Sequence, residues 1–419
     1  MKTRVVQLVA LLVLASCGSS ARTSAQNTDG SSGQANLAPS DPPFTAAPVA
    51  TFDSPWAMDF LPGLTKALVT EKNGRLWLID VVGGAKNEVA GAPRVVAEGQ
   101  GGLLDVKVSP HFAQDRLVYL TFAEPSQSGG SQLALARGTL VDADDGARLN
   151  GLQVVWHNPT GGKGGHFGAR IAFAPDGNSL FLSAGERQRF TPAQDPNLPM
   201  GKVLHLTLDG KPAAQRADES LKASTVSVTD PPEDSEIAKQ TAGRQFRWPG
   251  PNHTPAETWT LGHRNPLGLA FAPDGRLWEI EMGPKGGDEL NLIIEGRNYG
   301  YPRVSNGTNY NGVDIPDHRP GDGFEAPKAW WNPSISPADL LIYTGSLFPE
   351  WKGDALIPAL SGQALIHVRI RGDQASKADQ WDMGHRIRAV DQGPGGEVYV
   401  LEDGPRGRLL KLLPGQTRR

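Results

Sequence analysis

The chain has 419 residues, of which 41 are Lys or Arg and 45 are Asp or Glu, so its formal net charge at pH 7 is -4. No stripe of basic residues accompanies this balance, which argues against a nucleic-acid partner and leaves small molecules as the expected ligands. The 50 glycines and 34 prolines are abundant, and no long stretch has the apolar spacing of an amphipathic helix. The composition therefore predicts many short strands joined by turns.

The N-terminus resembles a bacterial lipoprotein signal. Lys2 and Arg4 precede an apolar run over residues 5–15, which is too short to cross a bilayer. Cys17, the only cysteine of the chain, follows where such a signal is cleaved and lipidated. We expect residues 1–17 to be a signal peptide ending at a lipidated Cys17. The alternative is an ordinary signal peptide with an incidental cysteine.

The residues after this cysteine suggest how the mature protein is held. Residues 18–48 are rich in Ser, Ala, Gly, Asn and Pro and are predicted to form a disordered tether before a folded body over residues 49–415. Gly18 resembles the residue that follows the cysteine in lipoproteins sorted to the outer membrane. We therefore expect an exported protein on the periplasmic side of the outer membrane, attached by its lipid anchor only.

One pattern occurs six times in the body: a short strand, a turn with Pro, Gly or Asp, and a second strand with β-branched or aromatic residues at alternate positions. The copies lie at residues 57–80, 106–124, 171–186, 269–282, 341–358 and 388–403. Such units cannot bury both faces alone, and a closed ring leaves no unit exposed. The sequence therefore predicts an all-β fold, a six-bladed β-propeller of four-stranded antiparallel blades, over an open sandwich. Residues 220–258 lack strand periodicity and are expected to be a surface insertion.

Seven motifs follow one another along this body. They occupy residues 99–104, 166–170, 200–204, 261–266, 283–291, 298–302 and 386–388. Together they resemble the soluble aldose sugar and glucose dehydrogenases, which use pyrroloquinoline quinone (PQQ), over the span from about residue 50 to the C-terminus. The resemblance implies a propeller enzyme that oxidises aldose sugars at C1 to the lactone, with PQQ and Ca²⁺ as cofactors.

The resemblance also implies two catalytic residues. His166 would take the proton of the substrate hydroxyl as hydride leaves, a role that suits a neutral imidazole with a pKa near ambient pH. Arg264 would stabilise the negative charge that develops on the acceptor. Without the resemblance, His166 would be interpreted as a turn histidine bonded to backbone, and Arg264 as the partner of a structural carboxylate.

Further residues match the family's contacts with PQQ, which carries three carboxylates. Arg264 and Asn265 match a cofactor-contacting pair, and Gln100 and Tyr310 match two other contacts. Arg386 and Arg388 are two residues apart, so on an extended strand both side chains leave the same face and suit a polyanion.

The calcium sites are implied by the family alone. Calcium takes oxygen ligands, including backbone carbonyls. Gly283 and Pro284 would hold the ion that touches the cofactor, through their carbonyls. Glu289 by its carboxylate and Tyr299 by its carbonyl resemble a second, structural calcium site.

Two residues depart from the family pattern, and the partners follow from the proposed chemistry. Ser361 stands where a lysine is usual, and Met282 stands where the glucose enzymes carry glutamine. The expected partners are a small-molecule sugar and a separate electron acceptor, since no haem-binding Cys-x-x-Cys-His is present. A monomer or a homodimer is expected. The alternatives are a non-catalytic propeller that binds glycans or proteins at the cell surface and a calcium-dependent lactonase.

Overall fold

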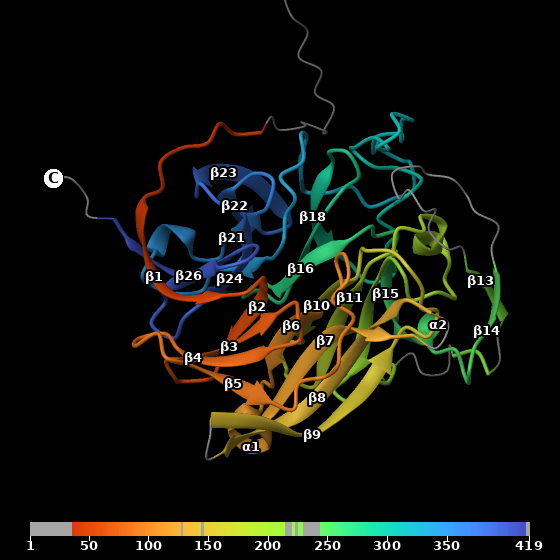
Figure 1. The fold of residues 1–419 in the computed structure, drawn as a ribbon. Coiled ribbons are helices and arrows are strands. Elements are labelled where there is room, and N and C mark those ends of the chain that lie inside the picture. The colour runs from red at the N-terminus through yellow and green to blue at the C-terminus, as the bar shows by residue number, and fades with distance from the viewer. Residues whose placement is uncertain are drawn as a thin grey trace, which may run out of the picture. The chain divides into compact units, whose positions relative to one another are not determined.

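The structure is a computed structural model that describes residues 36–126, 129–143, 146–213, 220–222, 225–228 and 244–415. Within the compact unit Gly33–Arg419, the described residues form a six-bladed β-propeller with four antiparallel strands in each blade (Figure 1). The outer strands of blades 1 and 2, Lys86–Ala90 and Gly146–His157, also pair in parallel and join these two blades into one eight-stranded sheet. The predicted signal peptide, Cys17 and the first part of the predicted tether lie outside the described residues. None of the helices that the structure describes combines the length and apolarity that a membrane crossing requires.

The predicted repeats coincide with the first strands of each blade. Blade 1 comprises β2 (Pro55–Phe60), β3 (Lys66–Glu71), β4 (Leu76–Asp80) and β5 (Lys86–Ala90). Blade 2 comprises β6 (Leu103–Val108), β7 (Leu117–Pro125), β8 (Ser131–Ala143) and β9 (Gly146–His157). Blade 3 comprises β10 (Gly168–Phe173), β11 (Ser179–Ala184), β12 (Lys202–Thr207) and β15 (Thr258–Leu261).

The remaining blades follow the same plan. Blade 4 comprises β16 (Pro266–Phe271), β17 (Leu277–Glu281), β18 (Asp288–Ile293) and β19 (Ala329–Trp331). Blade 5 comprises β20 (Leu341–Ile342), β21 (Ala355–Ala359), β22 (Ala364–Arg371) and β23 (Gln374–Asp382). Blade 6 comprises β24 (Ile387–Gln392), β25 (Val398–Glu402), β26 (Gly407–Pro414) and β1 (Phe44–Phe52). Short helices lie between strands: α1 (Phe112–Asp115), η1 (Thr191–Gln194), α2 (Thr254–Glu257) and η3 (Pro349–Trp351).

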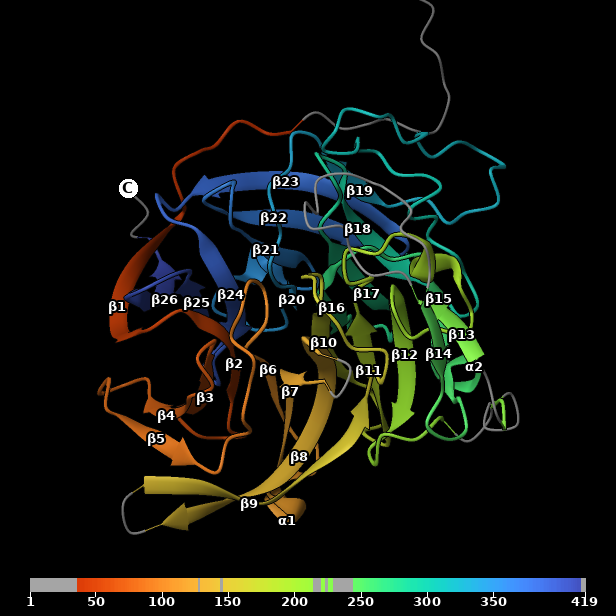
Figure 2. The same ribbon diagram turned by 45° about the vertical axis from the view of Figure 1, so that its right-hand side comes forward.

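The ring is closed by pairing between the two ends of the folded body. The outer strand of blade 6 is β1, which runs antiparallel to β26 with Phe44 opposite Pro414 and Phe52 opposite Gly407 (Figure 2). The innermost strands β2, β6, β10, β16, β20 and β24 each contact the next, and β24 contacts β2. Residues 44–48, expected in the tether, therefore belong to a strand. The sequence of β1 lacks the alternation of apolar and polar residues that marks a strand, because only its two end residues are buried.

The segment over residues 220–258 contains more structure than the predicted loop. Its described residues include a two-stranded sheet of β13 (Thr225–Val228) and β14 (Arg244–Arg247), separate from the blades, and also α2. Strands of four residues are too short for period-two alternation to be recognised.

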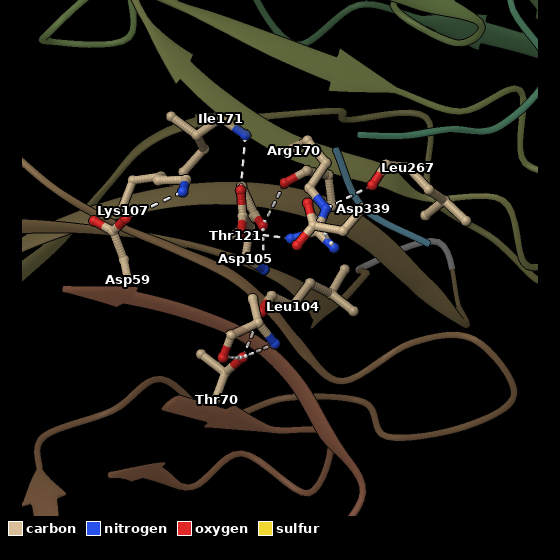
Figure 3. Close-up of polar contacts among 12 residues, drawn as sticks. Asp59, Thr70, Leu104, Asp105, Lys107, Thr121, Arg170, Ile171, Leu267 and Asp339 are labelled. Atoms are coloured by element: carbon tan, nitrogen blue, oxygen red, sulfur yellow. Dashed lines mark hydrogen bonds and ion pairs between the residues drawn. The ribbon is translucent and has the colours of Figure 1, made fainter. Parts of the chain in front are cut away.

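A buried arginine joins the inner strands of neighbouring blades. Arg170 of β10 is 3% exposed, and its Nη1 donates to Oδ1 of Asp105 in β6 at 3.0 Å. Its Nε donates to the carbonyl of Leu267 in β16 at 2.7 Å (Figure 3). Its Nη2 donates to the carbonyl of Ala338 before β20 at 2.6 Å. The other Asp105 oxygen accepts the backbone N–H of Ile171 at 2.8 Å. One guanidinium therefore connects blades 2, 3, 4 and 5.

Candidate active site

A cavity of about 450 Å³, here called the central cavity, is lined by loops and strand ends from several blades. Its lining includes four of the predicted cofactor residues, Gln100, Asn265, Arg386 and Arg388. Leu267 also lines it, so the blade-joining Arg170 contacts residues of its wall. The volume is within the range of roughly 300–1,000 Å³ that small-molecule sites occupy.

His166 lies beside this cavity and is held by two neighbours. Its backbone N–H donates to Oε1 of Gln100 at 2.7 Å, and the following residues, Phe167 and Gly168, line the cavity. Its imidazole is buried, and Nδ1 is 2.5 Å from Oε1 of Glu186, which follows β11. The carboxylate fixes the ring orientation and accepts a hydrogen bond from the Nδ1–H group. The other nitrogen, Nε2, therefore carries no proton and keeps a free lone pair.

The electrostatics favour a neutral imidazole. Burial, and next the charge of Arg264, lower the pKa of His166 below its ordinary value of 6.5. Burial is the largest single effect and would raise the pKa of Glu186, but the hydrogen bond and charge of His166, the charge of Arg264 and the backbone N–H of Phe190 together outweigh it, and the pKa of Glu186 is lowered. The pair is therefore an ionised carboxylate and an unprotonated imidazole, as a general base requires. The backbone N–H of Glu186 donates to the carbonyl of Arg264 at 2.9 Å, so Arg264 adjoins the residue whose carboxylate holds His166.

The loop that carries His166 is fixed by a buried arginine that sequence reasoning missed. The Nε of Arg187 donates to the carbonyl of Gly165 at 2.9 Å, and its Nη2 donates to that of Gly164 at 2.9 Å. The guanidinium also lies 3.9 Å from the ring centroid of Phe167. Because His166 has a positive φ of 48°, an unusual conformation for a residue with a Cβ, such support is needed to hold the loop.

Arg264 and Asn265 are fixed through their backbone. Oε2 of Glu281 accepts the backbone N–H of Arg264 at 2.5 Å and that of Asn265 at 3.2 Å. The Nη1 of Arg264 donates to the carbonyl of Gly283 at 2.6 Å, and Oδ1 of Asn265 accepts the backbone N–H of Gly168 at 3.1 Å. The buried Nε of Arg264 has no hydrogen-bond partner among the residues that the structure describes.

The cationic part of the cavity lies at blades 1 and 6. Arg386 and Arg388 converge on Asp403: the Nε of Arg386 is 2.8 Å from Oδ2, and the Nη2 of Arg388 is 2.7 Å from Oδ1. Lys72, after β3, lines the same cavity and donates to the carbonyl of Gly99 at 2.8 Å. Burial, and next the charge of Arg388, lower the pKa of Lys72. Three cations therefore share one carboxylate, so an anionic ligand would relieve their repulsion.

The other predicted site residues differ in their burial and in whether they line the central cavity. The carbonyl of Gly283 faces Arg264, and Pro284 follows it in the same turn. Tyr310 is 52% exposed on the connection between β18 and β19 and is not among the residues that line the central cavity. Glu289 and Tyr299 are buried and do not line the central cavity. The central cavity thus brings together four of the six predicted cofactor residues, while Arg264, Tyr310 and the predicted second calcium pair are not among its lining residues.

The two departures from the family pattern are both near the cavity. Met282 lines it. Ser361 donates through its hydroxyl to the hydroxyl of Ser336 at 2.8 Å, and Ser336 also lines the cavity. The lysine that the family resemblance led us to expect at residue 361 is absent, while Lys72 brings a cation to the cavity from blade 1.

Sequence reasoning missed several residues that hold the site together. They are Lys72, Glu186, Arg187, Glu281 and Asp403. The three acidic residues share a signal that was available: each lies at or next to the end of one of the six repeats. A carboxylate at the end of a blade's second strand can accept N–H groups or bind side chains of an adjacent loop.

Comparison with known proteins shows which family the chain matches. The family described as glucose/sorbosone dehydrogenase matches residues 52–227 and 244–411. The aldose sugar dehydrogenase YliI of Escherichia coli (strain K12) is 34% identical over 369 residues, which cover 86% of this chain and 90% of that protein.

Solved structures give the same result. The apo-form of the soluble aldose sugar dehydrogenase from Escherichia coli matches with a TM-score of 0.74 and 33% identity, over 89% of this chain and 100% of that one. The PQQ-bound form of an aldose sugar dehydrogenase from Streptomyces coelicolor matches with a TM-score of 0.65 and 26% identity, over 90% of this chain and 99% of that one.

Proposed function

We propose, because this chain belongs to the glucose/sorbosone dehydrogenase family, that it oxidises aldose sugars at C1 to the lactone with PQQ as its cofactor. The observation that carries the proposal is the buried pair of His166 and Glu186 beside a cavity that gathers cationic side chains. The PQQ-bound relative from Streptomyces coelicolor supports the choice of cofactor.

The donors of the central cavity fit PQQ. Arg386, Arg388 and Lys72 would bind its carboxylates, because one Asp403 neutralises only part of their charge. The buried Nε of Arg264, unsatisfied within the described residues, is a donor that an oxygen of the cofactor could satisfy. When bound, PQQ supplies the quinone that accepts the hydride.

The residues around the reacting sugar have separate tasks. The Nε2 of His166 takes the proton of the C1 hydroxyl as the hydride leaves that carbon. Glu186 stabilises the imidazolium that forms and keeps Nδ1 protonated throughout. Arg264, a fixed and buried cation, stabilises negative charge that develops on the acceptor side.

Calcium is the second proposed cofactor. The carbonyls of Gly283 and Pro284 would hold an ion next to the cofactor, since a carbonyl oxygen that accepts a hydrogen bond from Arg264 keeps a second lone pair. Glu289 and Tyr299 would hold the structural calcium, the first through its buried carboxylate and the second through its carbonyl.

Reconstitution tests this function. The apo-protein, loaded with PQQ and Ca²⁺, is expected to reduce an electron-accepting dye when aldoses are supplied, with the lactone as product. Omission of PQQ should abolish dye reduction. A loaded protein that binds sugars without dye reduction would support the glycan-binding alternative, and hydrolysis of lactones without PQQ would support the lactonase.

We also propose a cellular setting for this activity. The protein is exported and lipidated at Cys17, and its anchor holds it on the periplasmic side of the outer membrane. A separate electron acceptor then reoxidises the cofactor, because the sequence has no haem-attachment motif. The functional unit is a monomer or a homodimer.

A further inference from the structure

We propose that His263, Glu279 and Glu281 form a site for one divalent transition-metal cation, with Zn²⁺ as the best match to the donors. None of the three residues lines the central cavity, and none is among the residues proposed above for calcium. It would be a structural centre, and its existence does not depend on the proposed redox activity.

The three side chains converge from two elements. Glu279 and Glu281 are two residues apart in β17, so both project from the same face of the strand. His263 lies in the turn after β15, with Nδ1 at 3.1 Å from Oε1 of Glu281 and 3.9 Å from Oε2 of Glu279. One potential ligand atom from each residue lies within 4.8 Å of the other two. His263 and Glu279 are 0% exposed and Glu281 is 3% exposed.

Two oxygens at this cluster have no hydrogen bond within the described part of the chain. One is Oε1 of Glu279, and the other is Oδ1 of Asn291, a residue that is also 0% exposed. The Nδ2 of Asn291 donates to Oε2 of Glu279 at 3.0 Å and to Oε1 of Glu281 at 3.3 Å. A buried oxygen without a donor is costly, and a bound cation is one way to satisfy it.

The cluster also lacks a counter-charge from the protein. Over the described residues, no lysine or arginine forms an ion pair with Glu279 or Glu281, and His263 is the only basic side chain within ion-pair distance of them. Two adjacent buried carboxylates repel each other unless a cation or a shared proton lies between them. A divalent cation would neutralise both at once.

The donor set selects the class of metal. Imidazole with carboxylates suits Zn²⁺, whereas Ca²⁺ takes six to eight oxygens. Tetrahedral zinc with bonds of about 2.0–2.2 Å places its ligand atoms roughly 3.3–3.6 Å apart. The distances from Nδ1 of His263 to Oε1 of Glu281 and to Oε2 of Glu279, 3.1 and 3.9 Å, lie on either side of this spacing. Rotation of the Asn291 amide would direct its unsatisfied Oδ1 toward the carboxylates and offer a fourth ligand.

The environment orients the histidine as a metal site requires. Nε2 of His263 is 2.8 Å from the hydroxyl of Thr260, and the ring stacks on Tyr299 with centroids 4.6 Å apart. A hydrogen bond at Nε2 leaves Nδ1 directed toward the carboxylates, and such support of a ligating histidine is typical of metal sites.

The proposed cation would also support the active site. Oε1 of Glu281 faces His263, while its Oε2 accepts the backbone N–H groups of Arg264 and Asn265. Fixing this carboxylate on a cation would therefore hold the loop that presents Arg264 to the cavity. Glu281 is a positioning residue in this arrangement.

Metal analysis tests the proposal without reference to activity. Untagged wild-type protein, stripped with a chelator, is titrated with Zn²⁺ in the presence of Ca²⁺, desalted and analysed by mass spectrometry of its metals. We expect one tightly bound zinc per chain and a rise in Tm on zinc addition. Cobalt-loaded protein should show visible absorption bands of a low-symmetry nitrogen and oxygen site.

Two isosteric variants make the test specific. Glu279→Gln removes one ligand, so the Kd for zinc should rise at least about a hundredfold, with the cobalt bands and the Tm response lost. Glu257→Gln is the control, because Glu257 is also buried, accepts the indole N–H of Trp156 at 3.1 Å and belongs to none of the proposed sites; it should keep the zinc.

Three outcomes would overturn the metal site. The first is that wild-type protein holds no zinc, and the second is that Glu279→Gln binds zinc as tightly as the wild type does. The third is that Glu279→Gln has a higher Tm than the wild type, while the Tm of the wild type does not respond to metal. The last would show that the carboxylates share a proton. If Glu279→Gln does not fold, the proposal is tested by the zinc affinity of His263→Gln and by the number of zinc ions bound per wild-type chain.

Discussion

The Nδ1 of His166 lies 2.5 Å from Oε1 of Glu186, and the other oxygen of that carboxylate accepts two backbone N–H groups, from Arg189 at 2.5 Å and from Phe190 at 2.6 Å. These backbone donors hold Oε2 of Glu186, so Oε1 is the oxygen that faces His166. The histidine is therefore presented with one nitrogen protonated and the other free.

This arrangement predicts the effect of Glu186→Gln. The amide oxygen should stay on the backbone donors, so the amide NH₂ would face Nδ1 of His166 and force the proton onto Nε2. A base that already carries the proton cannot accept one, and we expect kcat for dye reduction to fall roughly 10²–10⁴-fold. PQQ absorbance of the loaded protein should be unchanged. Glu88→Gln, at an exposed position, is the control, and full turnover in Glu186→Gln would remove this pair from the mechanism.

The pH dependence follows from the pKa of His166. Burial and the charge of Arg264 lower this pKa below 6.5 in the folded protein. Since the neutral imidazole is the active form, kcat/KM should stay constant as pH falls through 6.5 and decline only at lower pH. NMR titration of the apo-protein gives an independent measure: in Arg264→Gln, the His166 pKa should move upward. An acid limb above 6.5 in the wild type would contradict this assignment.

The fold was predictable because its pattern repeats. Each blade's first two strands alternate around a Pro, Gly or Asp turn, and this local signal survives in all six copies. The third and fourth strands vary more, and β1 lacks alternation because it lies at the outer edge of blade 6. Ring closure by β1 and β26 is a long-range pairing that no local window contains.

The site was predictable where a residue belongs to a family motif. Gln100, Asn265, Arg386 and Arg388, which the motifs predict at the cofactor, all line one cavity, whereas Arg264 and Tyr310 are not among its lining residues. Charge partners such as Asp403 were missed because a position at the end of a repeat does not reveal which side chain the carboxylate binds. Its contact with Arg388, 15 residues earlier, arises only when β24 and β25 pair.

Lys72 is predicted to bind the cofactor in place of the lysine absent at residue 361. Lys72→Met should weaken PQQ binding about ten- to hundredfold, because a charge-assisted hydrogen bond contributes about 1.5–3 kcal/mol. Titration of the apo-protein with PQQ, followed by absorbance, measures this Kd. Lys66→Met, an exposed position of β3, should leave the Kd unchanged. Equal affinities for wild type and Lys72→Met would place Lys72 outside the cofactor site.

Cys17→Ser tests the lipid anchor. The mature wild-type protein should sediment with outer membranes and carry a lipid mass at its N-terminus, while the variant should lose both properties. Because the anchor is separate from the propeller, sugar oxidation by the variant after reconstitution should be unchanged. Continued membrane association of Cys17→Ser would show that attachment does not require lipidation.

Arg170→Met should destabilise the propeller strongly. The change leaves the Asp105 carboxylate buried without its cation and removes the donors to the carbonyls of Leu267 and Ala338. Breaking such a buried pair costs about 3–5 kcal/mol of the free energy of unfolding, which urea denaturation can measure. Arg75→Met is the control: Arg75 is 55% exposed with Glu88 at 3.7 Å, and its loss should cost less than about 1 kcal/mol. Equal losses in the two variants would mean that the blades are held together by apolar packing, with no special contribution from the guanidinium that joins them.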